Sequence, residues 1–297
     1  MSFSDNILPF VDISSLLFLF PVNIFIFIVN ILDWKKKRTL QASDKIITGI
    51  SVCNLVFGMV KLCKSLSTLY NITSMKIINS TIFLTAISCK IWFSACLCVH
   101  FCLKIVKIHH CFYIYLQRTF HKKLSWILVL SVVESVLVSP FVALYSPNEV
   151  ILSNAHLNSS MMIVPRNIQP LKISSFLLFC IPIFFAIILF AMSSLTITYT
   201  LCRHIKVLRN NSQDFQSSTT EAHIRATITV FTLFFLCLML VLYVTMSQMY
   251  FRLSGQKLQY IVVTLHFLFS ILNYWALING NQKLNKASRE MMNCLIC

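Results

Sequence analysis

The sequence predicts an all-α membrane protein built as a bundle of seven transmembrane helices. Its 297 residues are 57% hydrophobic and only 11% charged, which is too apolar for a soluble domain of this length. The apolar residues gather in long runs, and the run at 226–249 carries no charge over 24 residues. As a helix this run would extend about 36 Å, enough to cross a bilayer. A transmembrane barrel would instead show alternating segments of about ten residues, and the sequence has none.

Seven apolar runs can be assigned to helices, and the segments between them are short. The expected spans lie near residues 8–32, 46–69, 83–109, 124–145, 173–201, 225–249 and 258–280. The sequence shows no internal repeat and no stretch of soluble composition. Residues 1–297 are therefore expected to form one transmembrane domain.

The basic residues predict an N-terminus outside the cell and a C-terminus inside. In this orientation 17 of the 25 lysines and arginines fall in cytoplasmic segments, beginning with Lys35–Arg38 after the first span. The same clustering accounts for the net charge of +16, because the basic residues flank the apolar runs. The expected partner of these flanks is the lipid bilayer and no nucleic acid, so the chain is predicted to be a multi-pass protein of the plasma membrane.

Three glycosylation sequons fall in predicted outer loops, at Asn71, Asn79 and Asn158. Asn158 is the strongest candidate, because it lies in the middle of its loop and far from the membrane. A fourth sequon, at Asn210, falls in a predicted inner loop, where glycosylation does not occur.

Polar residues inside the spans suggest structural contacts. Asn23 lies ten residues before Asp33, and Asn54 lies ten residues after Asp44, so both amides are expected about 15 Å from the inner edge. An amide in hydrocarbon needs a partner, and these two are predicted to clamp the first two helices together. Glu134, midway along the fourth helix, is interpreted as a packed, hydrogen-bonded or protonated residue. A counter-charge for Lys90 and a contact to a cationic ligand remain alternatives.

A seven-helix bundle with short loops is most often a G-protein-coupled receptor, although this step is an analogy between folds. A transporter or channel would favour paired repeats and broken polar helices, whereas this chain has four glycines in total and no repeat. His109 and His110 are adjacent and point to different helix faces, so they make a poor metal pair. No catalysis, metal or cofactor is expected.

Short motifs of one receptor family occur in order along nearly the whole chain. They are Asn23-Ile-Phe-Ile, Val29-Asn30, Asp33-Trp34, Asp44, Trp92-Phe-Ser-Ala-Cys-Leu97, Leu103-Lys104-Ile105, Pro182, Ser194-Leu195, Thr220-Glu-Ala-His223 and Gly280-Asn281-x-Lys283-Leu284. Their order and spacing resemble the bitter taste receptors, taste receptor type 2. The Asp/Glu-Arg-Tyr and Asn-Pro-x-x-Tyr motifs of rhodopsin-like receptors are absent. Vomeronasal type 1 pheromone receptors share part of the pattern and remain the closest alternative.

The chain departs from that family at several positions. Asn54 stands where the family usually has an arginine, and Ser270 and Asn273-Tyr274 stand where it has proline and His-Ser or His-Pro. Phe83 and Ile87 stand where some members have a ligand-contacting Trp and Asn. These differences indicate a divergent member.

The resemblance implies a ligand cavity among the outer parts of helices three, six and seven. The candidate ligand-binding residues are Phe83, Ile87, Leu240, Tyr243 and Val263, for each of which plain helix packing is the alternative. A pocket lined by these residues would be apolar, which favours small apolar or amphipathic bitter compounds. Such a ligand would act by stabilising the active bundle over the resting one.

The resemblance also implies a heterotrimeric G protein, gustducin-like, as the cytoplasmic partner. The candidate coupling residues are Lys104, Lys107, Arg203, His204, Lys206, Arg209, His223 and Arg225. The basic members among them are also expected simply as a positive flank of the spans. Ser218-x-x-Glu221 fits a capping box, so the sixth helix is expected to begin inside the cytoplasm.

Overall fold

The computed structural model describes residues 3–69, 76–106, 111–144, 169–210, 227–235, 238–239, 241, 271–272 and 274–296. Within these residues the chain is helical and contains no strand. The labelled helices are α1 (Phe3–Lys37), α2 (Ala42–Leu69), α3 (Lys76–Ile105), α4 (Cys111–Leu144), α6 (Gln169–Asn210) and α9 (Gln282–Ile296). Shorter helical segments occupy 227–235 and 274–280.

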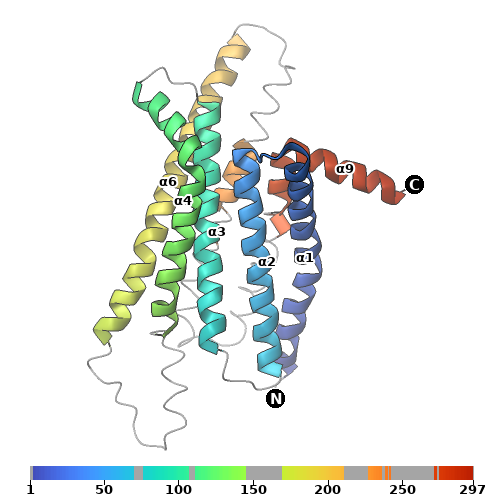
Figure 1. The fold of residues 1–297 in the computed structure, drawn as a ribbon, viewed down its shortest axis with the longest axis vertical. Helices are drawn as coiled ribbons and strands as arrows, with labels where there is room; N and C mark the ends of the chain where they lie inside the picture. Colours follow the sequence, from blue (N-terminus) through green and yellow to red (C-terminus); the bar gives the residue numbers. More distant parts are fainter. Residues whose placement is uncertain are drawn as a thin grey trace, which may run out of the picture.

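The helices α1, α2, α3, α4 and α6 stand side by side along the long axis, while α9 projects sideways from the end where α1 finishes (Figure 1). α3 packs against α2, α4 and α6, and α1 packs against α2. Among the described residues, four helical stretches are long and apolar enough to cross a membrane: Ala42–Cys63, Ile77–Ile105, Tyr113–Leu144 and Leu177–Thr200. The prediction of an all-α membrane protein is confirmed. The orientation of the termini stays a prediction.

Burial separates the central helix from the outer ones. The apolar span of α3 is 67% buried inside the protein, whereas those of α4 and α6 are each 28% buried. Exposed side chains of α4 and α6 are nonetheless apolar, such as Leu130, Leu137 and Phe184. An exposed face of this composition is stable only in contact with lipid. The outward faces of α4 and α6 are therefore expected to contact the bilayer.

Two helices continue at their C-terminal ends beyond the spans expected from hydropathy, and α4 begins at Cys111, well before the expected start at residue 124. α1 extends to Lys37, past the expected limit at residue 32, and α6 extends to Asn210, past the expected limit at residue 201. The extra turns are basic, and basic residues near a helix C-terminus are stabilised by the helix dipole. α1 then ends at Arg38, whose φ of 60° lies in the left-handed region, while the Arg38 N–H donates to the Trp34 carbonyl at 2.7 Å.

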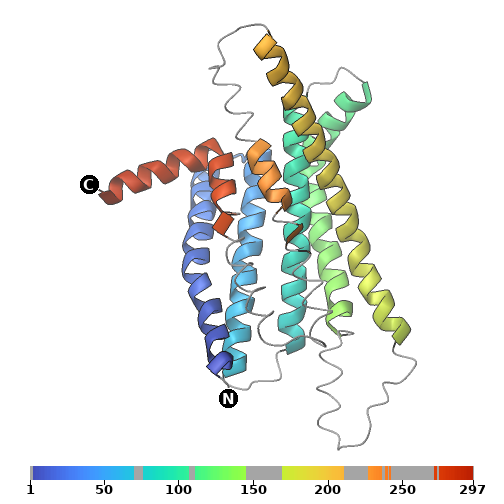
Figure 2. The same ribbon diagram turned by 180° about the vertical axis from the view of Figure 1, so that it is seen from behind.

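The segments 227–235 (orange) and 274–280 (red) lie on the side of the molecule that Figure 2 shows, in front of α1, α2 and α3 in that view. They approach each other closely, because a Cβ atom added at Gly280 would lie 2.5 Å from Thr229 Oγ1. Only glycine allows this approach, as small residues do at other helix contacts in membranes. Val230, Leu233 and Leu277 from these segments join the central core.

Candidate functional site

An apolar cleft lies between α3, α6 and the sixth apolar run. It is lined by Ile91, Ala186, Ile187, Phe190, Phe234 and Leu238. In this conformation its gaps are too narrow to admit a water molecule. Every lining residue is apolar, so the cleft can accept a hydrophobic surface but offers no side-chain hydrogen bond.

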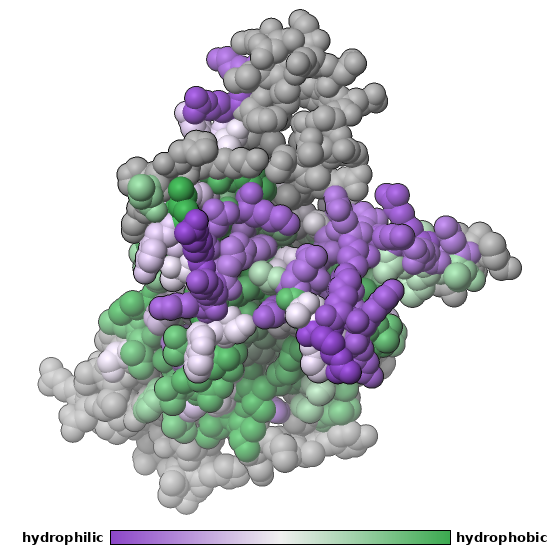
Figure 3. Space-filling view, turned by 45° about the horizontal axis from the view of Figure 1, so that its top comes forward, coloured by the Kyte–Doolittle hydropathy of each residue, from purple (hydrophilic) through white to green (hydrophobic). Residues whose placement is uncertain are grey.

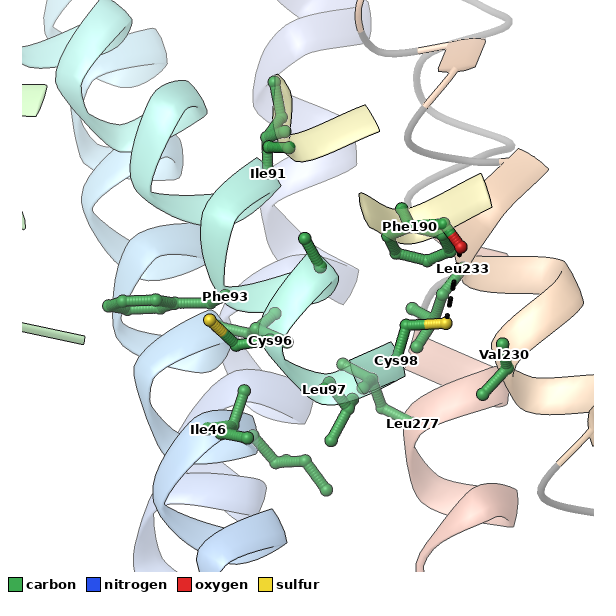
Figure 4. Close-up of a cluster of buried hydrophobic side chains, with 14 of the residues drawn as sticks. Ile46, Ile91, Phe93, Cys96, Leu97, Cys98, Phe190, Val230, Leu233 and Leu277 are labelled. Atoms are coloured by element: carbon green, nitrogen blue, oxygen red, sulfur yellow. Dashed lines mark hydrogen bonds between the residues drawn. The ribbon is translucent and has the colours of Figure 1, made fainter. Parts of the chain in front are cut away.

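Phe190 forms one wall of this cleft and connects three helices. It is 1% exposed, and its carbonyl accepts a weak hydrogen bond from Cys98 Sγ at 3.7 Å. Its ring stacks on Phe234, with centroids 5.3 Å apart and planes 26° apart. Figure 4 shows Cys98 of α3 pointing toward Phe190, with Val230 and Leu233 close by. One wall of the cleft is therefore in direct contact with the segment 227–235.

Buried amides join α1 to α2. Asn54 Nδ2 donates to Asn23 Oδ1 at 3.2 Å, and Asn23 Nδ2 donates to the Leu19 carbonyl at 2.7 Å. Asn30 lies on the same face of α1, and its Nδ2 donates to Thr48 Oγ1 of α2 at 2.9 Å. The two asparagines predicted to face each other are thus brought together.

The Asn23 side chain also reaches the seventh apolar run. Tyr274 is 5% exposed, and its hydroxyl lies within reach of a hydrogen bond to Asn23. Asn23 therefore contacts polar groups from two other helices. Asn54 and Tyr274 are two positions at which the sequence departs from the motif pattern described above. Both side chains contact the amide of Asn23.

A charged junction holds α9 to the first two helices. Lys283 Nζ lies 2.8 Å from Asp44 Oδ2 and 3.3 Å from Asp33 Oδ2. Asn281 Nδ2 donates to Asp44 Oδ1 at 2.8 Å, while Asn281 Oδ1 accepts the Lys283 N–H at 3.0 Å and so caps α9. Lys37 adds a second cation, 3.0 Å from Asp33 Oδ1.

The lysines at this junction favour the ionised form of Asp33. A hydrogen bond from Lys37, with a further one from Lys283, holds the pKa of Asp33 below its usual value. We call this end of the molecule the basic end: it carries the α1–α2 turn, the start of α9 and the exposed lysines of Lys35–Lys37, Lys122 and Lys123. Figure 3 shows hydrophilic residues gathered over this end and hydrophobic residues below them.

The sequence matches the family model described as Taste receptor protein (TAS2R) over residues 1–296. The chain belongs to the taste receptor protein family. The resemblance drawn from the short motifs is thereby confirmed. As a member of this family, the chain is a multi-pass membrane protein of a seven-transmembrane receptor class.

Individual taste receptors are related to the chain at modest identity. Mouse (Mus musculus) taste receptor type 2 member 110 is 26% identical over 295 residues, covering 93% of this chain and 89% of the relative. Member 8 from Pongo pygmaeus is 27% identical, covering 92% and 91% respectively. Human (Homo sapiens) member 2 is 28% identical over 220 residues, covering 72% and 71%. The similarity to taste receptors therefore extends over most of both chains.

The ligand-binding residues predicted for a taste receptor occupy different environments. Phe83 is half-buried and stacks on Phe57 with ring centroids 5.0 Å apart, and Ile87 is fully buried. Both pack against other helices in this conformation. Ile87 lies one turn from Ile91, which lines the cleft. Leu240, Tyr243 and Val263 lie outside the described residues.

The predicted coupling residues whose side chains the structure describes all lie at the basic end. Lys104 ends the apolar span of α3, while Arg203 and Lys206 lie in the last turns of α6, and all three are exposed. His204 and Arg209 belong to α6, but their side chains are outside the described set. Lys107, His223 and Arg225 also lie outside it.

Glu134 is half-buried beside the α3–α4 contact. Ser135 Oγ lies 3.5 Å from Glu134 Oε2 and 3.0 Å from Ser88 Oγ on α3. The Trp92 indole approaches the same carboxyl without forming a hydrogen bond of good geometry. Within the described residues, no group of three or more His, Cys, Asp or Glu side chains is arranged to hold a metal ion.

Of the predicted glycosylation sites, Asn79 lies in the first turn of α3 and is half-buried. Asn71 and Asn158 lie outside the described residues.

The sequence alone does not predict the charged junction. Its members Asp33, Asp44, Asn281 and Lys283 all belong to motifs of the family, but these motifs lie in separate parts of the chain. The signal that could connect them is opposite charge at three places: the end of the first run, the start of the second run and the end of the seventh run.

Proposed function

We propose that the chain is a G-protein-coupled chemosensory receptor that detects small apolar or amphipathic bitter compounds and activates a gustducin-like G protein. The observation that carries this proposal is the apolar cleft between α3, α6 and the sixth apolar run, in a member of the taste receptor family. A lining without charge or hydrogen-bonding side chains favours a ligand that binds mainly by burial of apolar surface.

Binding would act through the Phe190–Phe234 contact. The cleft is too narrow for a ligand in this conformation, so an agonist must separate side chains that now touch. It then favours a conformation in which α6 and the segment 227–235 are further apart. A ligand shifts this equilibrium only as far as it prefers the open conformation.

The output surface in this proposal is the basic end, with the N-terminus outside the cell. The exposed Lys104, Arg203 and Lys206 lie there on helices that border the cleft, α3 and α6. Separation of α6 from its neighbour would open this end to the C-terminal helix of a G-protein α-subunit.

The test is a calcium assay in cells that co-express the chain and a promiscuous G protein. Agonists from a panel of lipophilic bitter compounds should lose potency about tenfold or more in Ala186→Leu, because the added methyl groups occupy the cleft. Ala143→Leu is the matched control, since Ala143 is equally buried but lies on α4 away from the cleft. Surface expression is measured for each variant.

Two results would contradict the proposal. One is equal loss of potency in the two leucine variants at equal surface expression. The other is silence to every bitter compound together with a response to volatile pheromone-like molecules, which is the behaviour of a vomeronasal-type receptor.

A further inference from the structure

Three cations from two helices, Lys45 of α2 and Arg118 and Lys122 of α4, lie at the basic end, apart from the cleft. Lys45, in the first turns of α2, lies with its Nζ 3.4 Å from Ser125 Oγ on α4. Arg118 and Lys122 lie seven and three residues before Ser125, so they share its face of the helix. All four side chains are exposed.

These cations have no carboxylate partner among the described residues. The two acidic residues nearest in sequence to Lys45, Asp33 and Asp44, are instead paired with Lys37 and Lys283. Because like charges on neighbouring helices repel each other, the arrangement is most favourable with an anion between them.

The surface directly next to the cations is apolar and open. Trp126, Val129 and Val133 follow Lys122 on α4 at spacings of four, seven and eleven residues, which continue one helix face. Their side chains are 71%, 53% and 47% exposed. A molecule that binds here therefore meets positive charge at one end and a hydrocarbon surface below it. Trp126 lies at the boundary, where tryptophans are enriched in membrane proteins.

We propose that Lys45, Arg118, Lys122 and Ser125 form a binding site for the headgroup of a polyanionic membrane lipid, whose acyl chains lie along Trp126 and Val129. Three cations suit a headgroup with several phosphates, such as a phosphorylated inositol lipid, better than one with a single charge. A free inositol phosphate would satisfy the cations but would leave the apolar face of α4 unused, so the lipid is the occupant.

Native mass spectrometry of the full chain, released from micelles, measures this binding. The probes are phosphatidylinositol bisphosphate, phosphatidylserine and soluble inositol trisphosphate. The bisphosphate lipid should bind at least tenfold more tightly than the other two. Lys45→Gln/Arg118→Gln/Lys122→Gln should weaken its binding about 100-fold, since each surface cation contributes about fivefold.

The matched control is Lys35→Gln/Lys36→Gln/Arg289→Gln. It removes three exposed cations from the same end but outside the site, and should change binding by less than about fivefold. Equal losses in the two triple variants would overturn the proposal, because they would indicate a diffuse attraction. Equal binding of the soluble inositol phosphate would also overturn it.

A measurement on the unaltered chain guards against a variant that does not fold. A bisphosphate lipid with a photoreactive acyl chain should cross-link to residues 118–133 of α4, and an excess of unlabelled lipid should suppress this product. Cross-linking spread evenly over α1, α4 and α6 would contradict a defined site.

Discussion

Lys283 Nζ lies 2.8 Å from Asp44 Oδ2, joining residues that are 239 positions apart in the sequence. Asp44 is 3% exposed, so its carboxylate has little access to water and depends on Lys283 and Asn281 for stabilisation. A buried charge that loses its partner is far more costly than the pair is worth. This relationship makes the junction sensitive to the removal of either charge alone.

Lys283→Met should therefore destabilise the protein by about 2 kcal/mol, because Asp44 would keep only the Asn281 amide. The thermal unfolding of the solubilised chain measures this change. Lys286→Met is the control: its partner Glu290 is 3.8 Å away and exposed, so the loss should stay under about 0.5 kcal/mol. The double variant Lys283→Met/Asp44→Asn should recover part of the stability, and a strictly additive loss would argue against the pairing.

Part of the loss of stability at acidic pH should come from protonation of Asp33. Hydrogen bonds from Lys37 and Lys283 lower its pKa in the folded protein, so its contribution is complete above the unfolded value of about 4. This contribution is lost as the pH falls through the lower folded pKa. Melting temperatures between pH 6 and pH 3 should decline less steeply for Asp33→Asn than for the unaltered chain. Parallel curves would mean that Asp33 is not involved.

The hydrogen bond between the Asn54 and Asn23 side chains should be measurable as a coupling energy between α1 and α2. Asn23→Ala and Asn54→Ala each leave a buried amide group without its partner. The coupling in a double-mutant cycle should be about 1 kcal/mol, the size found for polar contacts between membrane helices. Unfolding of the four proteins in one detergent gives the value, and a coupling of zero would exclude a contribution from this bond.

Gly280→Ala should separate the segments 227–235 and 274–280. The added Cβ would lie 2.5 Å from Thr229 Oγ1 and 2.6 Å from Thr229 Cγ2, so the helices must move apart, at a cost of about 1–3 kcal/mol. Thr229→Ala removes both of these atoms and should restore part of the loss in the double variant. If Gly280→Ala melts at the temperature of the unaltered chain, the close approach is not required.

The sequence predicts the general architecture because the lengths and hydropathies of the runs determine which segments can cross a bilayer. It also places Asn23 opposite Asn54, since both lie at the same depth and each amide needs a partner. The helix ends are less predictable: the basic residues of α1 and α6 lie beyond the apolar runs, yet remain helical to Lys37 and Asn210.

The candidate site is harder to derive because hydropathy does not distinguish an apolar cavity from an apolar core. Ile87 and Ile91 are both isoleucines on α3, one turn apart; the first is buried in the core and the second also lines the cleft. The contact of Lys283 with Asp33 and Asp44 cannot be read from local sequence either, because no apolar run shows which other run its end will meet.

The attachment of α9 has a consequence for how the receptor is made. Synthesis places Asp44 in the bundle long before Asn281 and Lys283 leave the ribosome, so the carboxylate has neither partner until the chain is nearly complete. The junction can form only in a molecule that contains the beginning and the end of the bundle together. A product truncated before Gly280 would retain an unneutralised buried charge, which distinguishes it chemically from the finished protein. Asp44 thus links the completeness of the chain to the stability of its first two helices.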